Sequence, residues 1–388
     1  MNFDVAVIGA GLVGTAFARA ARGLSVALLA SAPHAPGARP QGAALDSRLY
    51  AISPANAAFL SGLGVWQRMA PSRLAPVHAM RVFGDDGRAM LEFDAYRTGV
   101  SELAWIVEEA ELLSALWQGI EGCETVTVLH EAHCTDLDIG ADAARVQLAD
   151  GRTLSAALVA GADGANSFVR ARAGLDARPE PYGQTAVVAN FDCERPHQGT
   201  AFQWFQGDAV LALLPLPGNR VSMVWSLPEG LAEHRMGLDA DALCAEVRRA
   251  SQGVLGALTL VTPARGFALR RLRLPRIIAP RVALLGDAAH VVHPLAGQGA
   301  NLGFQDAREL AAVLSGRPPQ GDAGDHALLR RYARARAEPV FAMDATVHGL
   351  QQLFGARNGV LASLRNTGLQ LVDRLPVVKN LLMRHAIG

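Results

Sequence analysis

Residues 286–303 combine glycines with a carboxylate, which is the composition of a ligand-binding loop. The glycines permit tight turns and a close approach of the backbone to a ligand; they are Gly286, Gly297, Gly299 and Gly303. Asp287 follows the apolar run 281–285, which is typical of a buried parallel strand, so we expect its carboxylate at that strand's carboxyl end. Residues 304–314 predict a helix whose positive end would favour an electron-rich or anionic ring beside the loop.

A second glycine turn follows the first predicted strand, residues 3–8. The turn comprises Gly9, Gly11, Leu12, Val13 and Gly14. In the dinucleotide fingerprint the first glycine makes the turn, the second lets the backbone reach a pyrophosphate, and the third lets helix and strand pack closely. Good helix formers and a second buried strand, 25–29, complete a β-α-β unit, which favours a dinucleotide site over a purely structural turn.

One part of the fingerprint is missing, because an acidic residue roughly 20 positions further on should bind the ribose hydroxyls. The second strand instead ends in Ala30 and Ser31, and Ser31 is a weak substitute. Loss of the carboxylate would cost on the order of 1–3 kcal/mol of cofactor binding. The sequence therefore leaves weaker cofactor retention open.

Asp163 and Arg48 become stronger candidates for site residues when they are considered together with these turns. Asp163 lies in the turn 161–164 after another predicted buried strand, and on its own an ordinary loop is an equal alternative. Together with Asp287, it indicates one long ligand held at several points. Arg48 precedes a helix predicted to begin at Ser53–Pro54, and in isolation it is typical of a surface salt bridge.

The 388 residues exceed one typical core and predict about two domains. Strand-length runs between 185 and 227 are separated by glycine and proline without a helical period, and a hairpin is predicted within 77–93. We expect an α/β fold: a Rossmann-like domain, an inserted, mostly antiparallel β-sheet domain and C-terminal helices. The expected boundaries are 1–76, 98–180 and 266–325 for the first domain, 77–97 and 181–265 for the second, and 326–388 for the helices.

Composition excludes several classes of protein. Lys plus Arg and Asp plus Glu are 36 each, so the formal net charge of zero disfavours nucleic acid as a partner. The four cysteines form no C-x-x-C pair, which fits free thiols in a reducing compartment and no metal site. The N-terminus lacks the basic region of a signal peptide, and no apolar stretch reaches about 18 residues, so we expect a cytoplasmic protein.

The C-terminal run 359–385 places leucines and valines near Arg365, Arg374, Lys379 and Arg384. Core-packing helices are the favoured interpretation. A face that docks on a membrane surface or a partner is the alternative.

Together these features resemble the flavoprotein aromatic hydroxylases and, within them, the ubiquinone-biosynthesis hydroxylase family, nearly from end to end. The most specific match is the run 293–303, His-Pro-Leu-Ala-Gly-Gln-Gly-x-Asn-Leu-Gly. The other matches are the Gly9-x-Gly11-x-x-Gly14 turn, Asp46-Ser47-Arg48 followed by Ala51-Ile52-Ser53 and Leu63-Gly64-Val65-Trp66, Gly161-Ala162-Asp163-Gly164, His197-x-x-Thr200-Ala201 and Leu214-Pro215-Leu216. The resemblance implies a fold like that of para-hydroxybenzoate hydroxylase.

The resemblance further implies FAD as cofactor and NAD(P)H as co-substrate. The glycine turn 9–14 would meet the FAD pyrophosphate, and Arg48 would lie near the flavin and its phosphates. Asp287 would bond the ribityl chain, and Asp163 would help to hold cofactor or reductant. The flavin ring would lie against Pro294, Gly297, Gln298, Gly299, Ala300, Asn301 and Leu302, where the helix dipole would stabilise the reduced, anionic ring.

In this family NAD(P)H reduces FAD, O2 adds to give a flavin hydroperoxide, and its distal oxygen attacks an electron-rich aromatic ring. The resemblance makes His293, Pro294 and Arg48 the candidate catalytic residues. His293 could bond the substrate or the hydroperoxide, and a structural role in fixing the loop is an equal alternative. Besides Ala30, the run 107–112 departs from the family, because it lacks the Asn-Arg pair that often follows Val-Glu.

We therefore predict an FAD-dependent monooxygenase that hydroxylates a prenylated phenol or quinone precursor in ubiquinone biosynthesis. A hydrophobic aromatic substrate would explain the Val-, Leu- and Phe-rich insert. A hydroxylase of another aromatic compound and a flavin-binding scaffold subunit of low activity are the alternatives. Contact of the C-terminal helices with the inner membrane or a multi-enzyme complex, and a homo-oligomer, stay open.

Overall fold

The computed structural model describes residues 1–33, 45–84, 90–175, 177–293 and 299–355. Its first sheet has the strand order β18-β19-β11-β1-β2-β8, with β10 and β9 attached to β11. All neighbours from β19 to β8 run parallel, as the buried apolar runs predict. The strands are β1 Asn2–Ile8, β2 Val26–Leu29, β8 Val126–Leu129, β9 Cys134–Ile139, β10 Ala144–Leu148, β11 Thr153–Gly161, β18 Ile278–Ala279 and β19 Val282–Leu284.

The register of this sheet brings three turns to one edge. Ile8 at the end of β1 is paired with Gly161 at the end of β11, and Gly161 with Leu284 at the end of β19. Because parallel strands end at the same edge, the turns after β1, β11 and β19 are neighbours.

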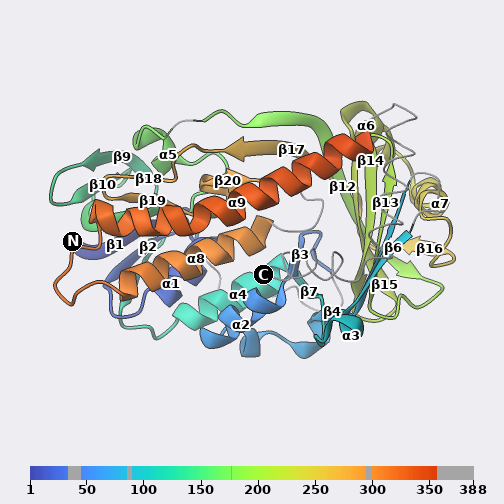
Figure 1. Ribbon diagram of the computed structural model, residues 1–388, viewed down its shortest axis with the longest axis horizontal. Helices are drawn as coiled ribbons and strands as arrows, with labels where there is room; N and C mark the ends of the chain where they lie inside the picture. Colours follow the sequence, from blue (N-terminus) through green and yellow to red (C-terminus); the bar gives the residue numbers. More distant parts are fainter. Residues whose placement is uncertain (34–44, 85–89, 176, 294–298, 356–388) are drawn as a thin grey trace.

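Helices cover one face of the first sheet and share a core with it. They are α1 Leu12–Ala20, α4 Glu109–Ile120, α8 Gly299–Ser315 and α9 His326–Gly355. On the other face, β9, β10 and the short helix α5 (Phe168–Arg172) enclose a second core. Figure 1 shows α9, in red, running along this helical layer toward the second sheet.

The second sheet has the order β20-β17-β12-β15-β14-β13-β5-β6, with β16 beside β12. Its neighbours are antiparallel except β13 and β5, as expected for the insert. The strands are β5 Ala79–Phe83, β6 Met90–Asp94, β12 Glu180–Cys193, β13 Thr200–Gln206, β14 Ala209–Leu216, β15 Arg220–Pro228, β16 Leu258–Leu260, β17 Arg265–Arg273 and β20 His290–Val291. The strands β5 and β6 form the predicted hairpin, whose turn lies outside the described residues.

The apolar composition of the insert has a structural explanation. Helices α6 (Glu229–Met236) and α7 (Ala240–Ala250) cover one face of the second sheet, and Phe191, Trp204 and Met223 are buried in the core between them. On β12 and β15 the residues between these apolar ones face the other way and include the buried polar pair Asn190 and Ser222. The Val-, Leu- and Phe-rich pattern thus forms a core, and it is no longer an argument for an apolar substrate.

Strand β17 changes the predicted domain boundary. Residues of Arg265–Arg273 pair with β12, so the second sheet continues beyond residue 266, where the first domain was expected to resume. After β19, the chain forms β20, which pairs with β17. The predicted strand and helix are present as β19 and α8, but the loop between them enters the second sheet, which the sequence analysis did not anticipate.

A small third sheet, which the sequence analysis did not anticipate, has the order β3-β7-β4. Its strands are β3 Leu49–Ile52, β4 Ala75–Val77 and β7 Ala104–Glu108. The adjoining helices are α2 Pro54–Gly62, α3 Ala95–Thr98 and the short 3-10 turns η1 Trp66–Arg68 and η2 Pro71–Arg73. Helix α2 begins at Pro54 after Ser53, as predicted.

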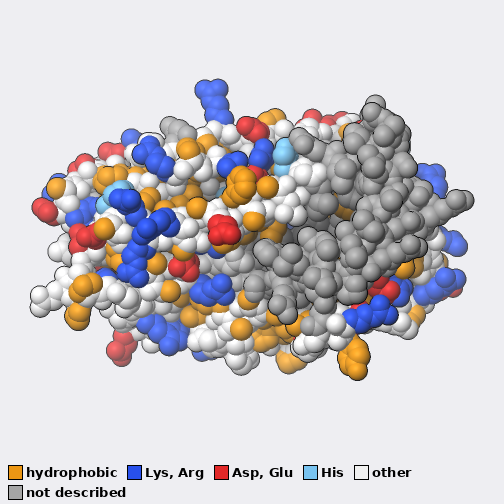
Figure 2. All heavy atoms as spheres, viewed as in Figure 1, with side chains coloured by type: hydrophobic (Ala, Val, Ile, Leu, Met, Phe, Trp, Pro, Cys, Tyr) orange, Lys and Arg blue, Asp and Glu red, His pale blue; other side chains and the backbone are white. Residues whose placement is uncertain are grey.

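Basic side chains mark the outer face of α9. Arg330, Arg331 and Arg334 are exposed, whereas Tyr332 is fully buried. Figure 2 shows arginine side chains gathered on the left half of this view, where α9 begins. Among the helices that the structure describes, none has the length and apolarity needed to cross a bilayer. The amphipathic run 359–385 lies outside the described residues.

Candidate active site

The glycine turn after β1 has one open position and two closed ones. A Cβ atom on Gly9, whose φ is +104°, would lie 2.4 Å from the Ala162 carbonyl oxygen, and one on Gly14 would lie 1.9 Å from the Gly9 carbonyl oxygen. A Cβ atom on Gly11 would meet no atom within 4 Å. Gly9 and Gly14 are therefore required for packing, and Gly11 leaves space for a ligand at the N-terminus of α1.

The side chain of Val13 packs against two glycines of the loop 286–303 and leaves little room for a side chain at either. A Cβ atom on Gly286, at φ +57°, would lie 3.1 Å from Val13 Cγ2, and one on Gly303 would lie 2.4 Å from the same atom. Both glycines thus admit the first turn of α1, where the sequence analysis expected a ligand to approach. Leu12, the other residue predicted between the glycines, is buried in the helical core.

Asp287 lies in the 3-10 turn η3 (Gly286–Ala288), directly beyond β19. Its side chain is exposed to solvent, yet desolvation by the surrounding protein raises its pKa, against the opposing effects of His290 and Arg48. Exposure together with desolvation is typical of a group in a recess. Among the described residues no donor hydrogen-bonds this carboxylate, so it is available to a ligand.

Arg48 lies near enough to Asp287 for its charge to lower the pKa of that carboxyl, and it contacts residues next to both large sheets. Its guanidinium lies 3.4 Å from the Glu109 carboxylate and 5.1 Å from the ring centroid of Phe267 on β17. Desolvation raises the pKa of Glu109, and the charge of Arg48 opposes that rise. The pKa of the nearby Tyr50 is also raised, mainly by desolvation and secondarily by the negative charge of Glu109. The predicted surface salt bridge of Arg48 exists, but it belongs to a polar cluster beside Asp287.

Asp163 is engaged in the fold. Its carboxylate accepts hydrogen bonds from Ser167 Oγ at 2.5 Å and from the Val169 backbone N–H at 3.1 Å, at the start of α5. The two carboxylates that the sequence analysis paired are therefore not equivalent. Asp287 is open to a ligand, whereas Asp163 stabilises a helix N-terminus, and a contact of Asp163 with cofactor stays a prediction.

The start of α8 is fixed by Asn301. Its Oδ1 accepts from the Ser53 backbone N–H at 3.0 Å and from Asn56 Nδ2 at 2.8 Å, and its Nδ2 donates to the Ala51 carbonyl at 2.7 Å. The first N–H groups of a helix have no intrahelical partner, so this anchored end can face an anionic or electron-rich group. Gly299, Ala300 and Leu302 lie in this first turn, and a Cβ atom on Gly299 would meet no atom within 4 Å. Pro294, Gly297 and Gln298 lie outside the described residues.

The end of β2 has no acidic side chain to offer. Ala30 is buried, its N–H donates to the Leu129 carbonyl, and its own carbonyl accepts from Ala132. Ser31 follows it and is exposed. The position after β2 where the acid was expected is therefore occupied by Ala30 and Ser31 in the folded protein, and neither carries a carboxylate.

His293 is buried with a relative exposure of 1%. Its Nε2 lies 3.0 Å from Gln184 Oε1 on β12, and the ring of Tyr182 packs edge-on at 4.9 Å between centroids. Desolvation lowers the pKa of His293 from 6.5 to about 4. The histidine is therefore neutral at physiological pH and cannot serve there as a resident cation.

A buried charged network, which the sequence analysis missed, supports this loop. Asp306 on α8 accepts from the Gly286 backbone N–H at 2.8 Å and from Arg336 Nε on α9 at 2.6 Å, and it lies 2.7 Å from His290 Nε2. Desolvation acts to raise the pKa of Asp306, but His290, Arg336 and the backbone bond outweigh it and the pKa is lowered. The available signal was an acidic residue in the first half of the helix predicted over residues 304–314.

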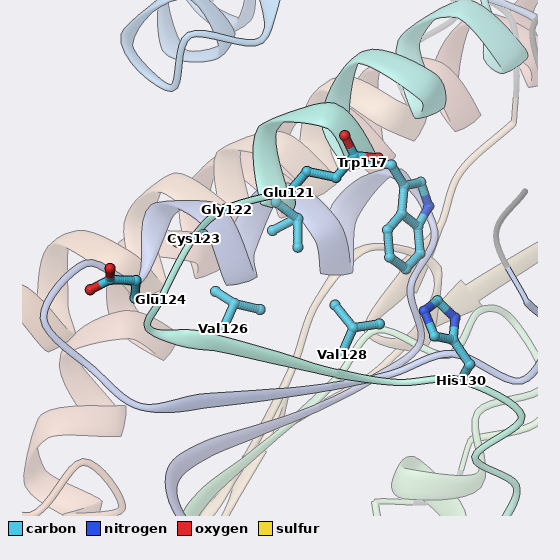
Figure 3. Close-up of a pocket in the computed structure, with 9 residues that line it drawn as sticks. Trp117, Glu121, Gly122, Cys123, Glu124, Val126, Val128 and His130 are labelled. Carbon is cyan, nitrogen blue, oxygen red and sulfur yellow. The ribbon is translucent and has the colours of Figure 1, made fainter. Parts of the chain in front are cut away.

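A groove of about 550 Å³ lies apart from these residues, between α4 and β8. Figure 3 shows Val126 and Val128 on its floor, with the indole of Trp117 beside the ring of His130. Those two rings stack at 5.9 Å between centroids. None of the residues predicted to bind cofactor or substrate lines this groove, so it is not part of the candidate site.

Residues 2–345 match the protein family described as FAD binding domain. The chain belongs to this family. It is 35% identical over 391 residues to ubiquinone hydroxylase UbiL of Rhodospirillum rubrum, covering 99% of this chain and 89% of the relative. It is 32% identical over 391 residues to 3-demethoxyubiquinol 3-hydroxylase of Escherichia coli, covering 99% and 98%. The crystal structure of Pseudomonas aeruginosa PqsL with 2-aminobenzoylacetate superposes with a TM-score of 0.78 at 25% identity, covering 95% of this chain and 100% of PqsL.

These relatives confirm the predicted resemblance to the ubiquinone-biosynthesis hydroxylases and the predicted fold class. FAD is the cofactor of the family, and the residues present fit it. Gly11 leaves room for a pyrophosphate beside the backbone, Asp287 offers a carboxylate that no described residue hydrogen-bonds, and α8 presents an anchored positive end.

The glycine turn of this FAD-binding protein predicts opposite effects for two alanine substitutions. Gly14→Ala should destabilise the apoprotein by at least about 1–3 kcal/mol, because its Cβ would overlap the Gly9 carbonyl. Gly11→Ala should leave the apoprotein's free energy of unfolding unchanged but weaken FAD binding. Urea denaturation and FAD titration measure the two effects. Full FAD affinity in Gly11→Ala would show that the pyrophosphate does not lie there.

Asp306→Asn should cost roughly 3–5 kcal/mol of stability, because it leaves the buried Arg336 without its anionic partner. The matched control is Glu92→Gln, which breaks the more exposed pair with Arg81 and should cost about 0–1 kcal/mol. Urea denaturation of both variants gives the comparison. Similar losses in the two variants would contradict the importance of the network.

The lowered pKa of His293 predicts a pH-dependent stability. The unfolded chain takes up the proton near pH 6.5 and the folded protein only near pH 4, so His293 lowers the free energy of unfolding as pH falls through that interval. The total loss is up to about 3 kcal/mol. Unfolding measured from pH 7 to 4 should depend less on pH in His293→Gln than in wild type. The exposed His133→Gln is the control and should follow the wild-type curve.

Proposed function

We propose that this chain is an FAD-dependent monooxygenase that uses NAD(P)H and O2 to hydroxylate the aromatic ring of a prenylated phenol or quinone precursor in ubiquinone biosynthesis. The carrying observation is the convergence of Gly11, Asp287 and the start of α8 at one edge of the first sheet. The nearly full-length similarity to two ubiquinone hydroxylases supports the pathway and the substrate class.

Bound FAD, reduced by NAD(P)H, supplies the activation of O2. The protein's own part is binding, orientation and exclusion of water. The backbone at Gly11 would bind the pyrophosphate, and the Asp287 carboxylate would accept from hydroxyl groups of the ribityl chain. Arg48 would lie beside the cofactor, since its guanidinium packs on Phe267 and its charge acts on Asp287. The anchored start of α8 would favour negative charge on the flavin ring.

The two large sheets would divide the work. The first sheet and its helices would hold FAD, and the second sheet, which now includes β17, would cover the substrate. We further propose that the region 326–388 contacts the inner membrane surface or a multi-enzyme complex. The exposed Arg330, Arg331 and Arg334 of α9 support this docking. A cytoplasmic location and self-association stay predictions.

The function is tested with purified protein. We expect the absorbance of bound flavin and an NAD(P)H oxidation that increases with a prenylated phenol and yields a hydroxylated product. Asp287→Ala should lose almost all FAD, because the missing ribose acid leaves this carboxylate a larger share of the binding. The exposed Asp142→Ala is the control and should keep its FAD. A full flavin complement in Asp287→Ala would show that the anchor lies elsewhere.

A deletion strain separates the alternatives. Accumulation of a quinone precursor that this gene cures supports the pathway, whereas normal quinone levels indicate another aromatic substrate. The absence of an acid at Ala30 and Ser31 favours the scaffold alternative, in which the purified protein is colourless and consumes no NAD(P)H with added FAD and phenol.

A further inference from the structure

His293 and Gln184 form a buried contact between the loop that follows β20 and the second sheet. His293 Nε2 and Gln184 Oε1 lie 3.0 Å apart, although the residues are 109 positions apart in the chain. Tyr182, also on β12, packs its ring edge against the imidazole. The second sheet therefore fixes the position of the imidazole ring.

The partners of Gln184 also fix where the imidazole carries its proton. Gln184 Nε2 donates to the Asp208 carbonyl oxygen at 2.7 Å. A carbonyl oxygen only accepts, so the amide cannot be reversed, and Gln184 Oε1 must face His293. Because Oε1 is itself only an acceptor, His293 Nε2 must carry the hydrogen. In a neutral ring, Nδ1 is then a bare acceptor.

No described residue donates a hydrogen bond to that acceptor. His293 is 1% exposed, and its Nδ1 has no hydrogen-bond partner in the part of the chain that the structure describes. A buried acceptor without a donor is costly, and sites that bind ligands commonly retain such groups. The lowered pKa of the ring agrees with the neutral form. The site therefore suits a ligand that brings a hydroxyl donor.

We propose that Gln184 is a positioning residue that holds His293 in the Nε2–H form, so that Nδ1 accepts a hydrogen bond from the phenolic hydroxyl of the aromatic substrate. The proposal rests on the proposed function, since it names the group that recognises that substrate. The phenol is favoured over a cofactor hydroxyl because His293 is held by β12 of the second sheet, whereas the predicted pyrophosphate and ribityl contacts lie at the edge of the first. A hydrogen bond from the phenol to nitrogen also increases the electron density of the ring that is to be attacked.

The first test needs no substrate. Long-range proton–nitrogen spectra of the apoprotein, assigned by the loss of signals in His293→Gln, should show Nε2 protonated and Nδ1 bare in the wild type. In Gln184→Met the Nδ1–H form should become populated. Gln184→Asn, whose amide is one methylene too short for both partners, gives the same test if the methionine variant folds poorly. The control Gln206→Met removes an amide that also donates to a backbone carbonyl, that of Ala250, and should leave the His293 signals unchanged.

The second test uses 2-prenylphenol and its methyl ether, with binding to FAD-loaded protein followed by the flavin absorbance. Wild type and Gln206→Met should bind the phenol roughly 2- to 10-fold more tightly than the ether, as one hydrogen bond allows. Gln184→Met and His293→Gln should lose that preference.

Each outcome decides a different statement. A protonated Nδ1 in the wild type, or a preference that survives in Gln184→Met, overturns the inference and leaves the proposed function intact. Failure of the phenol both to bind and to stimulate NAD(P)H oxidation overturns the proposed function together with the substrate contact. A Nε2–H tautomer that Gln184→Met abolishes, with loss of the preference for the phenol, supports the inference.

Discussion

The buried carboxylate of Asp306 is the interaction on which the candidate site depends most. A carboxylate without solvent is stable only when charges and hydrogen bonds replace its water, and here Arg336, His290 and the Gly286 N–H do so. These partners come from α9, from the start of β20 and from the turn before Asp287. One fully buried residue therefore sets the position of a turn whose neighbouring carboxylate is open to a ligand.

Glycines, which lack a side chain, are as important for the candidate site as the buried charge of Asp306. Val13 packs where a Cβ on Gly303 would overlap it, a Cβ on Gly14 would overlap the Gly9 carbonyl, and one on Gly9 would overlap the backbone of Ala162. The first turn of α1, the turn after β19 and the helix α8 are therefore interlocked by contacts that only glycine permits. Within the turn after β1, Gly11 is the exception, because its Cβ would meet no atom within 4 Å and its backbone is left open to a ligand.

The loop between β19 and α8 belongs to both large sheets. It begins at the edge of the first sheet, pairs through β20 with β17 of the second, and places His293 against Gln184 on β12 before α8 starts. Arg48 makes a parallel connection, because it contacts Glu109 on one side and Phe267 of β17 on the other. Both connections link the second sheet to the edge of the first sheet at which Gly11 and Asp287 lie.

The sequence by itself determined the features that depend on local pattern. The glycine turn after β1, the parallel apolar strands, the antiparallel insert, the start of α2 at Pro54 and the position of Asp287 at a strand end follow from spacing and from the restrictions of glycine and proline. The tertiary structure alone decided which glycines pack and which stay open, that Asp163 hydrogen-bonds to the N-terminus of α5, that β17 joins the second sheet, and that Asp306 and Gln184 hold the loop. Those outcomes arise from contacts between residues far apart in the chain, such as the 109 positions between Gln184 and His293, and no local pattern encodes which distant partners meet.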